Sequence, residues 1–130
     1  MSKPKITETI ELSLPVNAAY VSTARLTASS IANRQGFDVD ETEDIKAAVS
    51  EACTYIIRKS HGCGSLFRLV FDIGDGHVAI ALTSENAIDN ADDEEMSILM
   101  IQALMDNMTI TNNGTGLAIQ MQKTHHVMKL

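Results

Sequence analysis

Apolar and polar residues alternate near the start of the chain, from Ile10 to Leu14, directly before Pro15. This period of two predicts a short strand that ends at the proline. Beyond Asn17, which has the side chain of an N-cap residue, apolar positions recur at helical spacing until Gly36, which supplies a left-handed exit. We therefore expect a first helix whose core-facing residues are Val21, Ala24, Ala28, Ile31 and Ala32.

A second and longer apolar stripe predicts the best-determined helix of the chain. Asp40 and Glu43 precede it with the three-residue spacing of a capping box, with Asp in place of Ser or Thr. The helix has to end near Gly62 and Gly64, because glycine is a poor helix former. Its core-facing residues are Ile45, Ala48, Val49, Ala52, Cys53 and Ile56.

Alternation with a period of two returns after these glycines and predicts a hairpin. A Gly-Asp-Gly turn at 74–76 separates the two alternating segments. The residues that share one apolar face are Phe67, Leu69, Phe71 and Ile73 before the turn and Val78, Ile80 and Leu82 after it.

The last third of the chain predicts a loop, a third helix and a second hairpin. Residues 84–93 are polar, acidic and rich in turn formers, which favours a loop, with Asp92 or Asp93 capping the helix that follows. We expect a turn at 112–114 and a frayed tail from Lys123 onward. The helix is marked by Met96, Leu99, Met100, Ala103 and Leu104, and the strands by Thr109 and by Leu117, Ile119 and Met121.

The predicted order is strand, two helices, hairpin, helix and hairpin, with each helix apolar on one face. One sheet with helices packed on a single face satisfies this order. The sequence therefore predicts an α/β two-layer sandwich, with one mixed but mostly antiparallel sheet and helices on one face. We expect residues 1–130 to form a single domain, because 130 residues suffice for one core and not for two.

Charge and cysteine content narrow the function classes. The chain has 10 Lys and Arg against 17 Asp and Glu, and the formal net charge of −7 disfavours binding to nucleic acid or to anionic membranes. Its apolar runs are far shorter than the roughly 18 residues of a membrane span, and its first residues lack an apolar signal core, so we expect a cytoplasmic protein. Two cysteines, Cys53 and Cys63, are too few for a disulfide scaffold and match no zinc spacing, which favours buried reduced thiols.

The stretch from Ala-Arg-Leu-Thr at 24–27 through Asp-Ile-Lys-Ala-Ala-Val-Ser-Glu-Ala-Cys-Thr at 44–54 resembles a known family. It is similar to the anti-sigma-factor serine kinases of bacterial sporulation and general-stress control, within the histidine-kinase-like ATPase superfamily. Residues 104–107 and 114–118 also fall where that family has its third helix and final hairpin. The resemblance implies the histidine-kinase-like ATPase fold, binding of ATP and Mg²⁺ through three motifs, and phosphorylation of a serine on a partner protein.

The first family motif is a helix with Glu and, one turn later, Asn. The Asn holds Mg²⁺, and the Glu serves as base for the attacking serine. Here Glu51 matches the base, but Tyr55 stands at the Asn position, and a phenol is a poor ligand for a hard cation. The resemblance therefore predicts a vestigial base without a magnesium site.

The other two motifs have also lost their chemistry. The adenine-binding motif is an Asp followed by glycines, and here it reads Ser84-Glu85-Asn86. The phosphate-binding motif is Gly-x-Gly, whose counterpart reads Glu95-Met96-Ser97. Residues 92–95 are all carboxylates, and at an effective dielectric of about 20 two unit charges 4 Å apart interact by roughly 4 kcal/mol, so this cluster opposes a triphosphate.

The magnesium ligand, the adenine acceptor and the phosphate-binding glycines are all replaced, and only the glutamate is retained. This pattern predicts a degenerate member of the family. We expect an anti-sigma-factor-like regulatory protein that binds a sigma factor or an anti-anti-sigma antagonist, with no ATP, Mg²⁺ or other cofactor and no kinase activity. The alternative is an active serine/threonine kinase that binds ATP through altered ligands, and a third class is a structural homodimeric subunit. Arg25 is the expected partner contact, and the family implies a homodimer formed by the first strand and first helix.

Simpler interpretations of the same residues stay open. Glu51 could be a solvated helix residue paired with a side chain such as Arg58, and Arg25 an ordinary surface residue. Methionine at helical spacing is more often core filling than a binding surface, and this applies to Met96, Met100, Met105 and Met108. His125 and His126 could bind a metal, but adjacent histidines near a chain end are mostly solvated. The acidic run 89–95 could bind calcium, but it lacks the spacing of an EF-hand, which favours a solvated loop.

Overall fold

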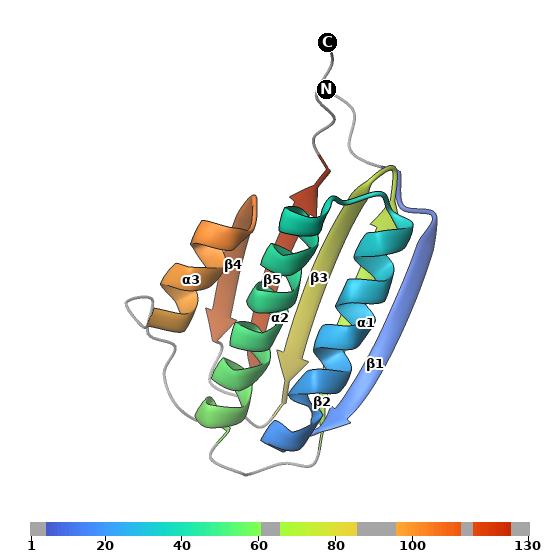
Figure 1. Ribbon diagram of the computed structural model, residues 1–130. Helices are drawn as coiled ribbons and strands as arrows, with labels where there is room; N and C mark the ends of the chain where they lie inside the picture. Colours follow the sequence, from blue (N-terminus) through green and yellow to red (C-terminus); the bar gives the residue numbers. More distant parts are fainter. Residues whose placement is uncertain (1–4, 61–65, 86–95, 113–115, 126–130) are drawn as a thin grey trace.

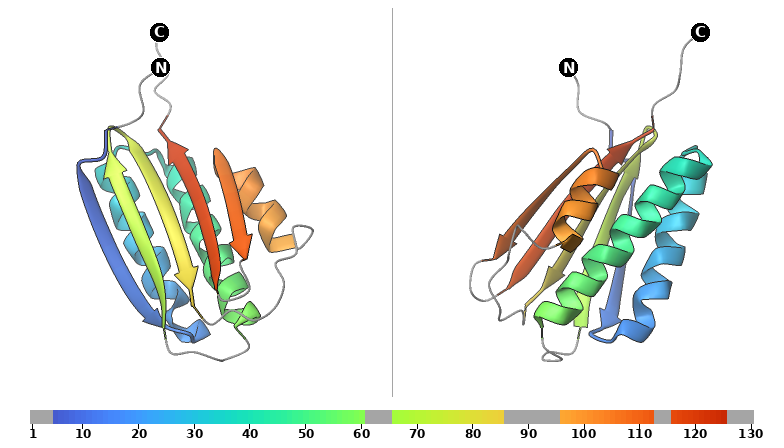
Figure 2. Two further views of the ribbon diagram at one scale, coloured as in Figure 1. Left: turned by 180° about the vertical axis from the view of Figure 1, so that it is seen from behind. Right: turned by 60° about the vertical axis from the view of Figure 1, so that its left-hand side comes forward.

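The computed structural model describes residues 5–60, 66–85, 96–112 and 116–125. In these residues a layer of helices covers one face of a five-stranded sheet (Figures 1 and 2). The predicted two-layer α/β architecture is confirmed. The elements are β1 (Glu8–Pro15), a 3-10 helix (Ala18–Tyr20), α1 (Val21–Arg34), α2 (Val39–Lys59), β2 (Leu66–Gly74), β3 (His77–Ser84), α3 (Met96–Leu104), β4 (Asn107–Asn112) and β5 (Leu117–Thr124).

The strand order is β1-β2-β3-β5-β4, and every neighbouring pair in it is antiparallel. The sheet described here is thus antiparallel throughout, where the sequence predicted a mixed one. The β2–β3 connection is a two-residue turn in which Asp75 has φ 53° and Gly76 has φ 68°. Positive φ at both central positions gives the backbone twist that a tight hairpin needs.

The two faces of the sheet differ sharply in composition. The helix-facing rows of β2, β3 and β5 are apolar and buried, as the alternation predicted. The helix-free face carries short or polar residues, with an ion pair between Glu11 on β1 and Arg68 on β2. Hydrophobic burial therefore acts on one face only, which is why the helices gather there. The buried apolar residues of β2, β3 and β5 are Phe67, Leu69, Phe71, Ile73, Val78, Ile80, Leu82, Leu117, Ile119 and Met121.

The helices begin at caps that differ in part from those expected. Asn17 caps the 3-10 helix, where its side chain accepts from the Ala19 amide, and α1 begins after it. The capping box of α2 is formed by Asp38 and Glu41, not by Asp40 and Glu43. Both pairs have the same spacing, so the sequence alone could not separate them. Gly36 has φ 84° and provides the predicted left-handed exit from α1.

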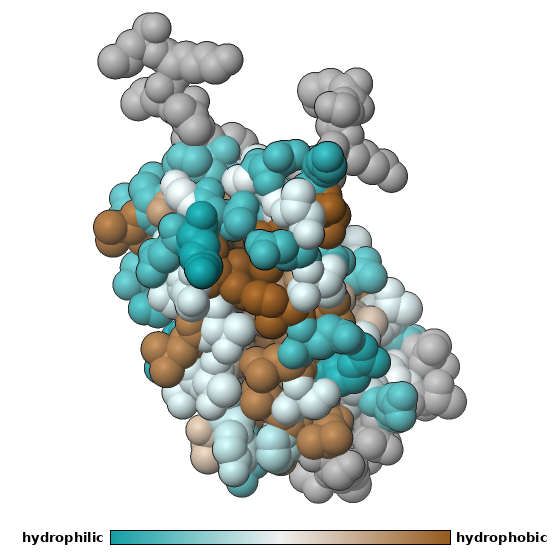
Figure 3. Space-filling view, turned by 90° about the vertical axis from the view of Figure 1, so that its right-hand side faces the viewer, coloured by the Kyte–Doolittle hydropathy of each residue, from teal (hydrophilic) through white to brown (hydrophobic). Residues whose placement is uncertain are grey.

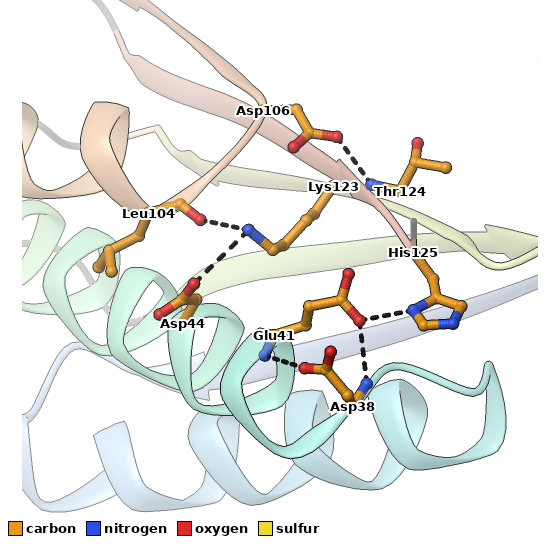
Figure 4. A network of polar contacts seen from close by, with 8 residues as sticks. All are labelled: Asp38, Glu41, Asp44, Leu104, Asp106, Lys123, Thr124 and His125. Atoms are coloured by element: carbon orange, nitrogen blue, oxygen red, sulfur yellow. Dashed lines mark hydrogen bonds and ion pairs between the residues drawn. The ribbon is translucent and has the colours of Figure 1, made fainter. Parts of the chain in front are cut away.

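A polar network ties the N-terminus of α2 to the ends of β5 and α3 (Figure 4). Lys123 donates to the Leu104 carbonyl at 2.7 Å and lies 3.7 Å from Asp44. His125 contacts Glu41, the residue that also completes the capping box. The predicted fraying from Lys123 and the solvated state of His125 are therefore wrong for this segment, because β5 pairs with β3 as far as Thr124.

The third helix packs through different residues from those the pattern indicated. Ser97, Ile98 and Ile101 are its buried positions. Met96 is 70% exposed, Leu99 48% and Met100 38%, so two of the four methionines expected in the core are not there. Met105 is buried and Met108 half-buried, as expected for core filling. The sequence could not choose a face here because α3 is apolar almost all round.

Several expectations fall outside the described residues. These are the helix stop at Gly62 and Gly64, Cys63, the loop and acidic run to residue 95 including Asn86 and Glu95, the turn at 113–114, and His126. Among the helices that are described, not one is both long and apolar enough to cross a membrane.

Candidate functional site

Arg25 and Glu51, predicted for different roles, line one groove between α1 and α2. The groove has a volume of about 460 Å³, and its other lining residues are Glu43, Lys46, Ala47 and Ser50. The α2 positions are spaced by three and four residues, which places them on one helix face. The retained glutamate therefore lies beside the expected partner contact.

The charged side chains of this groove differ in whether they are paired within the protein. Lys46 is paired with Glu43 at 3.4 Å. Arg25 is exposed, as predicted, and makes no hydrogen bond or ion pair with the part of the chain that the structure describes. Its guanidinium is thus available to a carboxylate from outside. The Ser50 hydroxyl is buried in the groove without a hydrogen-bond partner among the described residues, which is a costly state for a polar atom.

Glu51 is held by Ser97, a position predicted for the third family motif. The Ser97 hydroxyl donates to Glu51 Oε2 at 3.0 Å, and Ser97 is only 7% exposed. This bond joins α2 to α3 across the space where the first and third motifs meet. Glu51 was expected to pair with a side chain such as Arg58, whose guanidinium lies over the Tyr55 ring.

Tyr55, for which the resemblance predicts the magnesium-ligand position of the first motif, is fully buried. The Arg58 guanidinium lies 5.6 Å from its ring centroid, and the Lys59 ammonium lies 5.5 Å from it. Both distances are within the range of cation–π attraction. The phenol ring therefore serves as a platform for two cations at the C-terminal end of α2.

Ser84, the first residue of the predicted adenine motif, is buried at the end of β3. Its hydroxyl lies 3.4 Å from that of Ser60, which in turn donates to the Ile56 carbonyl. This end of the predicted motif thus holds a pair of neutral hydroxyls between α2 and β3. Asn86 and Glu95, the remaining motif positions, lie outside the described residues.

Cys53 is a buried free thiol one turn before Ile56. Burial raises its pKa to about 12 from the usual 9.0, because the thiolate loses its hydration. The predicted buried, reduced state of this cysteine is confirmed.

Sequence reasoning missed the two contacts that organise this region. In the sequence, Ser97 stands out only as a serine at a position where the family motif has glycine. Its bond to Glu51 joins residues 46 positions apart, so no local pattern indicates it. The sequence could have indicated the groove residues Lys46 and Ser50. Their spacing of three and four residues places them on the same face of α2 as Glu43 and Ala47. No local pattern points to the Ser60–Ser84 pair.

The fold is that of a histidine kinase-like ATPase domain. The model of that domain family matches residues 14–123, so the chain belongs to this family. The predicted membership of its anti-sigma-factor serine kinase branch is confirmed by similarity to the serine-protein kinases RsbW.

The relatives cover most of the chain. The RsbW of Halalkalibacterium halodurans is 34% identical over 110 residues, which are 85% of this chain and 68% of that protein. The RsbW of Oceanobacillus iheyensis is 30% identical over 135 residues, covering 88% and 85% of the two chains. A crystal structure of the RsbU and RsbW domains of a Mycobacterium tuberculosis protein shares the fold, with a TM-score of 0.73 and 16% identity. The match covers 91% of this chain and only 32% of the crystallised chain.

We predict that Ser97→Ala lowers the free energy of unfolding by about 1.5 kcal/mol, because it removes a hydrogen bond to a carboxylate in a largely buried place. Urea denaturation of this variant, of Glu51→Ala and of the double variant should give a coupling energy of about 1 kcal/mol. Ser22→Ala, on the exposed face of α1, is the matched control and should change stability by less than about 0.5 kcal/mol. Strictly additive effects would show that the bond contributes nothing.

Proposed function

We propose that this protein is an anti-sigma-factor-like regulator that acts by binding a protein partner and does not phosphorylate it. Membership of the RsbW-related family supports the regulatory part of the proposal. In this proposal residues 1–130 act as one domain. The protein acts in the cytoplasm, because its partner regulates transcription there. The partner is a sigma factor or an anti-anti-sigma antagonist.

The observation that carries the loss of catalysis is that the motif positions are bonded within the protein. Glu51 accepts from Ser97, Ser84 lies beside Ser60, and Tyr55 is enclosed beneath two cations. These residues do not fit ATP and Mg²⁺, since a buried phenol is a poor magnesium ligand and a serine hydroxyl lacks the acceptor charge of the family's Asp.

The alternative is an active serine kinase that binds ATP through other ligands, and calorimetry separates the two. We expect no binding of ATP with Mg²⁺ at a Kd below about 1 mM, which corresponds to roughly −4 kcal/mol. The melting temperature should also stay unchanged at millimolar Mg-ATP, whereas a ligand at 100 times its Kd would add about 2.7 kcal/mol of stability. The Oceanobacillus iheyensis RsbW, a named kinase, is the positive control. A clear thermal shift with this chain would support the kinase.

The α1–α2 groove is the proposed partner site. Both the unengaged Arg25 and Glu51 line it. The resemblance implies that the arginine contacts a partner and that the glutamate faces the partner's serine. The protein has a net charge of −7, so Arg25 is a local exception to its overall field. A partner carboxylate can pair with both arms of the guanidinium, a geometry that lysine cannot reproduce.

We predict that Arg25→Ala weakens binding to the sigma factor or antagonist by roughly 2 kcal/mol or more, as expected for a hot spot. Its melting behaviour should stay within about 0.5 kcal/mol of wild type, because the side chain is exposed. Arg25→Lys should recover only part of the affinity, and Arg68→Ala, on the helix-free face of the sheet, should have no effect. Unchanged affinity of Arg25→Ala for a verified partner would move the binding face elsewhere.

A homodimer is proposed through β1 and α1. Figure 3 shows apolar surface between polar rims on this side of the molecule, where a groove of about 630 Å³ runs between the two elements. Ile10, Ile31 and Ile73 line it, and Ile10 is 41% exposed. Its rim carries Glu8 and Arg34, opposite charges that a two-fold axis could bring together. β1 is also an edge strand of the described sheet.

We predict that the protein sediments as a dimer of the 14.1 kDa chain at micromolar concentration, and that Ile10→Glu shifts it to monomer by placing a charge in this groove. Val39→Glu, at an exposed apolar position on α2, is the control and should stay dimeric. A wild-type chain that is monomeric throughout would remove the proposal. A dimer without any partner affinity would favour the purely structural role.

A further inference from the structure

The α1–α2 groove contains two polar groups that the protein itself leaves unpaired. Arg25 makes no hydrogen bond or ion pair with the described residues, and the buried hydroxyl of Ser50 has no hydrogen-bond partner among them. The two residues come from adjacent helices and line the same groove (Figure 1). A ligand in this groove therefore meets one cation and one hydroxyl whose hydrogen-bonding capacity is unused.

The unpaired hydroxyl of Ser50 is unusual for a helix of this protein. A serine or threonine in a helix commonly donates to the carbonyl four residues earlier. Thr27 makes this bond to Thr23 on α1, and Ser60 makes it to Ile56 at the end of α2. A buried hydroxyl without a partner destabilises the folded chain, and alanine would avoid that cost and favour the helix. The fold therefore gives no reason for a serine at this position.

The other charged side chains of the groove limit the charge of a ligand. Lys46 is paired with Glu43, and Glu51 accepts from Ser97. The two glutamates repel a dianion more strongly than a monoanion. The groove is therefore suited to an anion of single charge that Arg25 can hold.

We propose that Ser50 is a binding residue that donates to a partner carboxylate held by Arg25. The proposal rests on the proposed function, in which this groove binds the partner, and it names the group recognised as the side chain of an aspartate or glutamate. Each carboxylate oxygen has two acceptor sites, so the group accepts from the guanidinium and from the hydroxyl together. Ser50 is only half-buried, so rotation about one bond turns its hydroxyl into the groove.

Two donors directed at one ligand group select a group that only accepts. A carboxylate satisfies this condition at both oxygens, whereas the amide of asparagine or glutamine presents donors on one side. Ala47 lies three residues before Ser50 and also lines the groove, and its small side chain leaves room for the ligand. Ser50 would thus favour an acidic side chain over the amide of the same shape.

The test uses acetate as the carboxylate probe on the full chain. Chloride is replaced by acetate at constant ionic strength, and the side-chain Nε–Hε signal of Arg25 should shift in nuclear magnetic resonance spectra. The signal of Arg68 is the control, because its guanidinium is already paired with Glu11. Acetamide, an uncharged molecule of the same shape, should move neither signal.

Ser50→Ala should weaken acetate binding by roughly threefold or more and raise the melting temperature, because it removes an unpaired buried hydroxyl. Thr42→Val is the matched control. Thr42 carries the other buried hydroxyl without a partner among the described residues, and it does not line the groove. This variant should bind acetate as wild type does. Ser50→Thr, which keeps a hydroxyl, should retain most of the affinity.

Unchanged acetate affinity of Ser50→Ala, or a lowered melting temperature, would give the hydroxyl a structural role and overturn the proposal. So would an Arg25 signal that acetate does not move, or tighter binding of inorganic phosphate than of acetate. The proposed function is tested separately, by the affinity of Arg25→Ala for the protein partner. If Arg25→Ala weakens that binding and Ser50→Ala does not, the partner groove is supported and the role of Ser50 is wrong.

Discussion

The apolar face of the sheet has to be covered, and α2 covers its centre. Eight of its residues are buried, among them the small Ala48 and Ala52, which let the helix approach the strands closely. Packing thus fixes the rotation of α2 about its own axis. Glu51 adjoins Ala52, and Tyr55 adjoins Ile56, so the same turns that bury the core also set the direction of the motif residues. The site cannot be repositioned without repacking the core.

The polar groups beside this core are partners of one another. Here hydroxyl, carboxylate and aromatic groups from α2, β3 and α3 satisfy each other. Each such bond contributes about 1 kcal/mol to folding. The residues left in a costly or exposed state lie elsewhere, at Ser50, at Arg25 and at the exposed apolar side chains Met96 and Leu99 of α3.

The sequence predicted the fold well wherever a residue pattern was compatible with only one local structure. Strict alternation placed Phe67, Phe71 and Ile80 in the core, and the long stripe of α2 defined its buried face. Prediction failed where two solutions had equal local support. Asp38 and Asp40 each stand three residues before a glutamate, and α3 offers two apolar faces, so only tertiary packing decides between them.

The candidate site was predictable in part for the same reason. Arg25 and Glu51 follow from helical spacing and from the family resemblance, and their shared groove follows from the contact of α1 with α2. The bond of Glu51 to Ser97 spans 46 positions, and that of Ser60 to Ser84 spans 24. Contacts of this range depend on how helices and strands are placed in space, which a local pattern does not encode.

The helix-free face of the sheet has a practical consequence. Its rows of alanine, threonine and glutamine, with Ala79, Ala81 and Gln120 at the centre, offer little apolar area to bury. Association would gain little there, because the hydrophobic effect scales with the apolar area removed from water. The face is therefore suited to carrying reporters. A fluorophore attached at the exposed Thr83 or Gln120 would follow the molecule through complex formation while leaving the helical layer untouched.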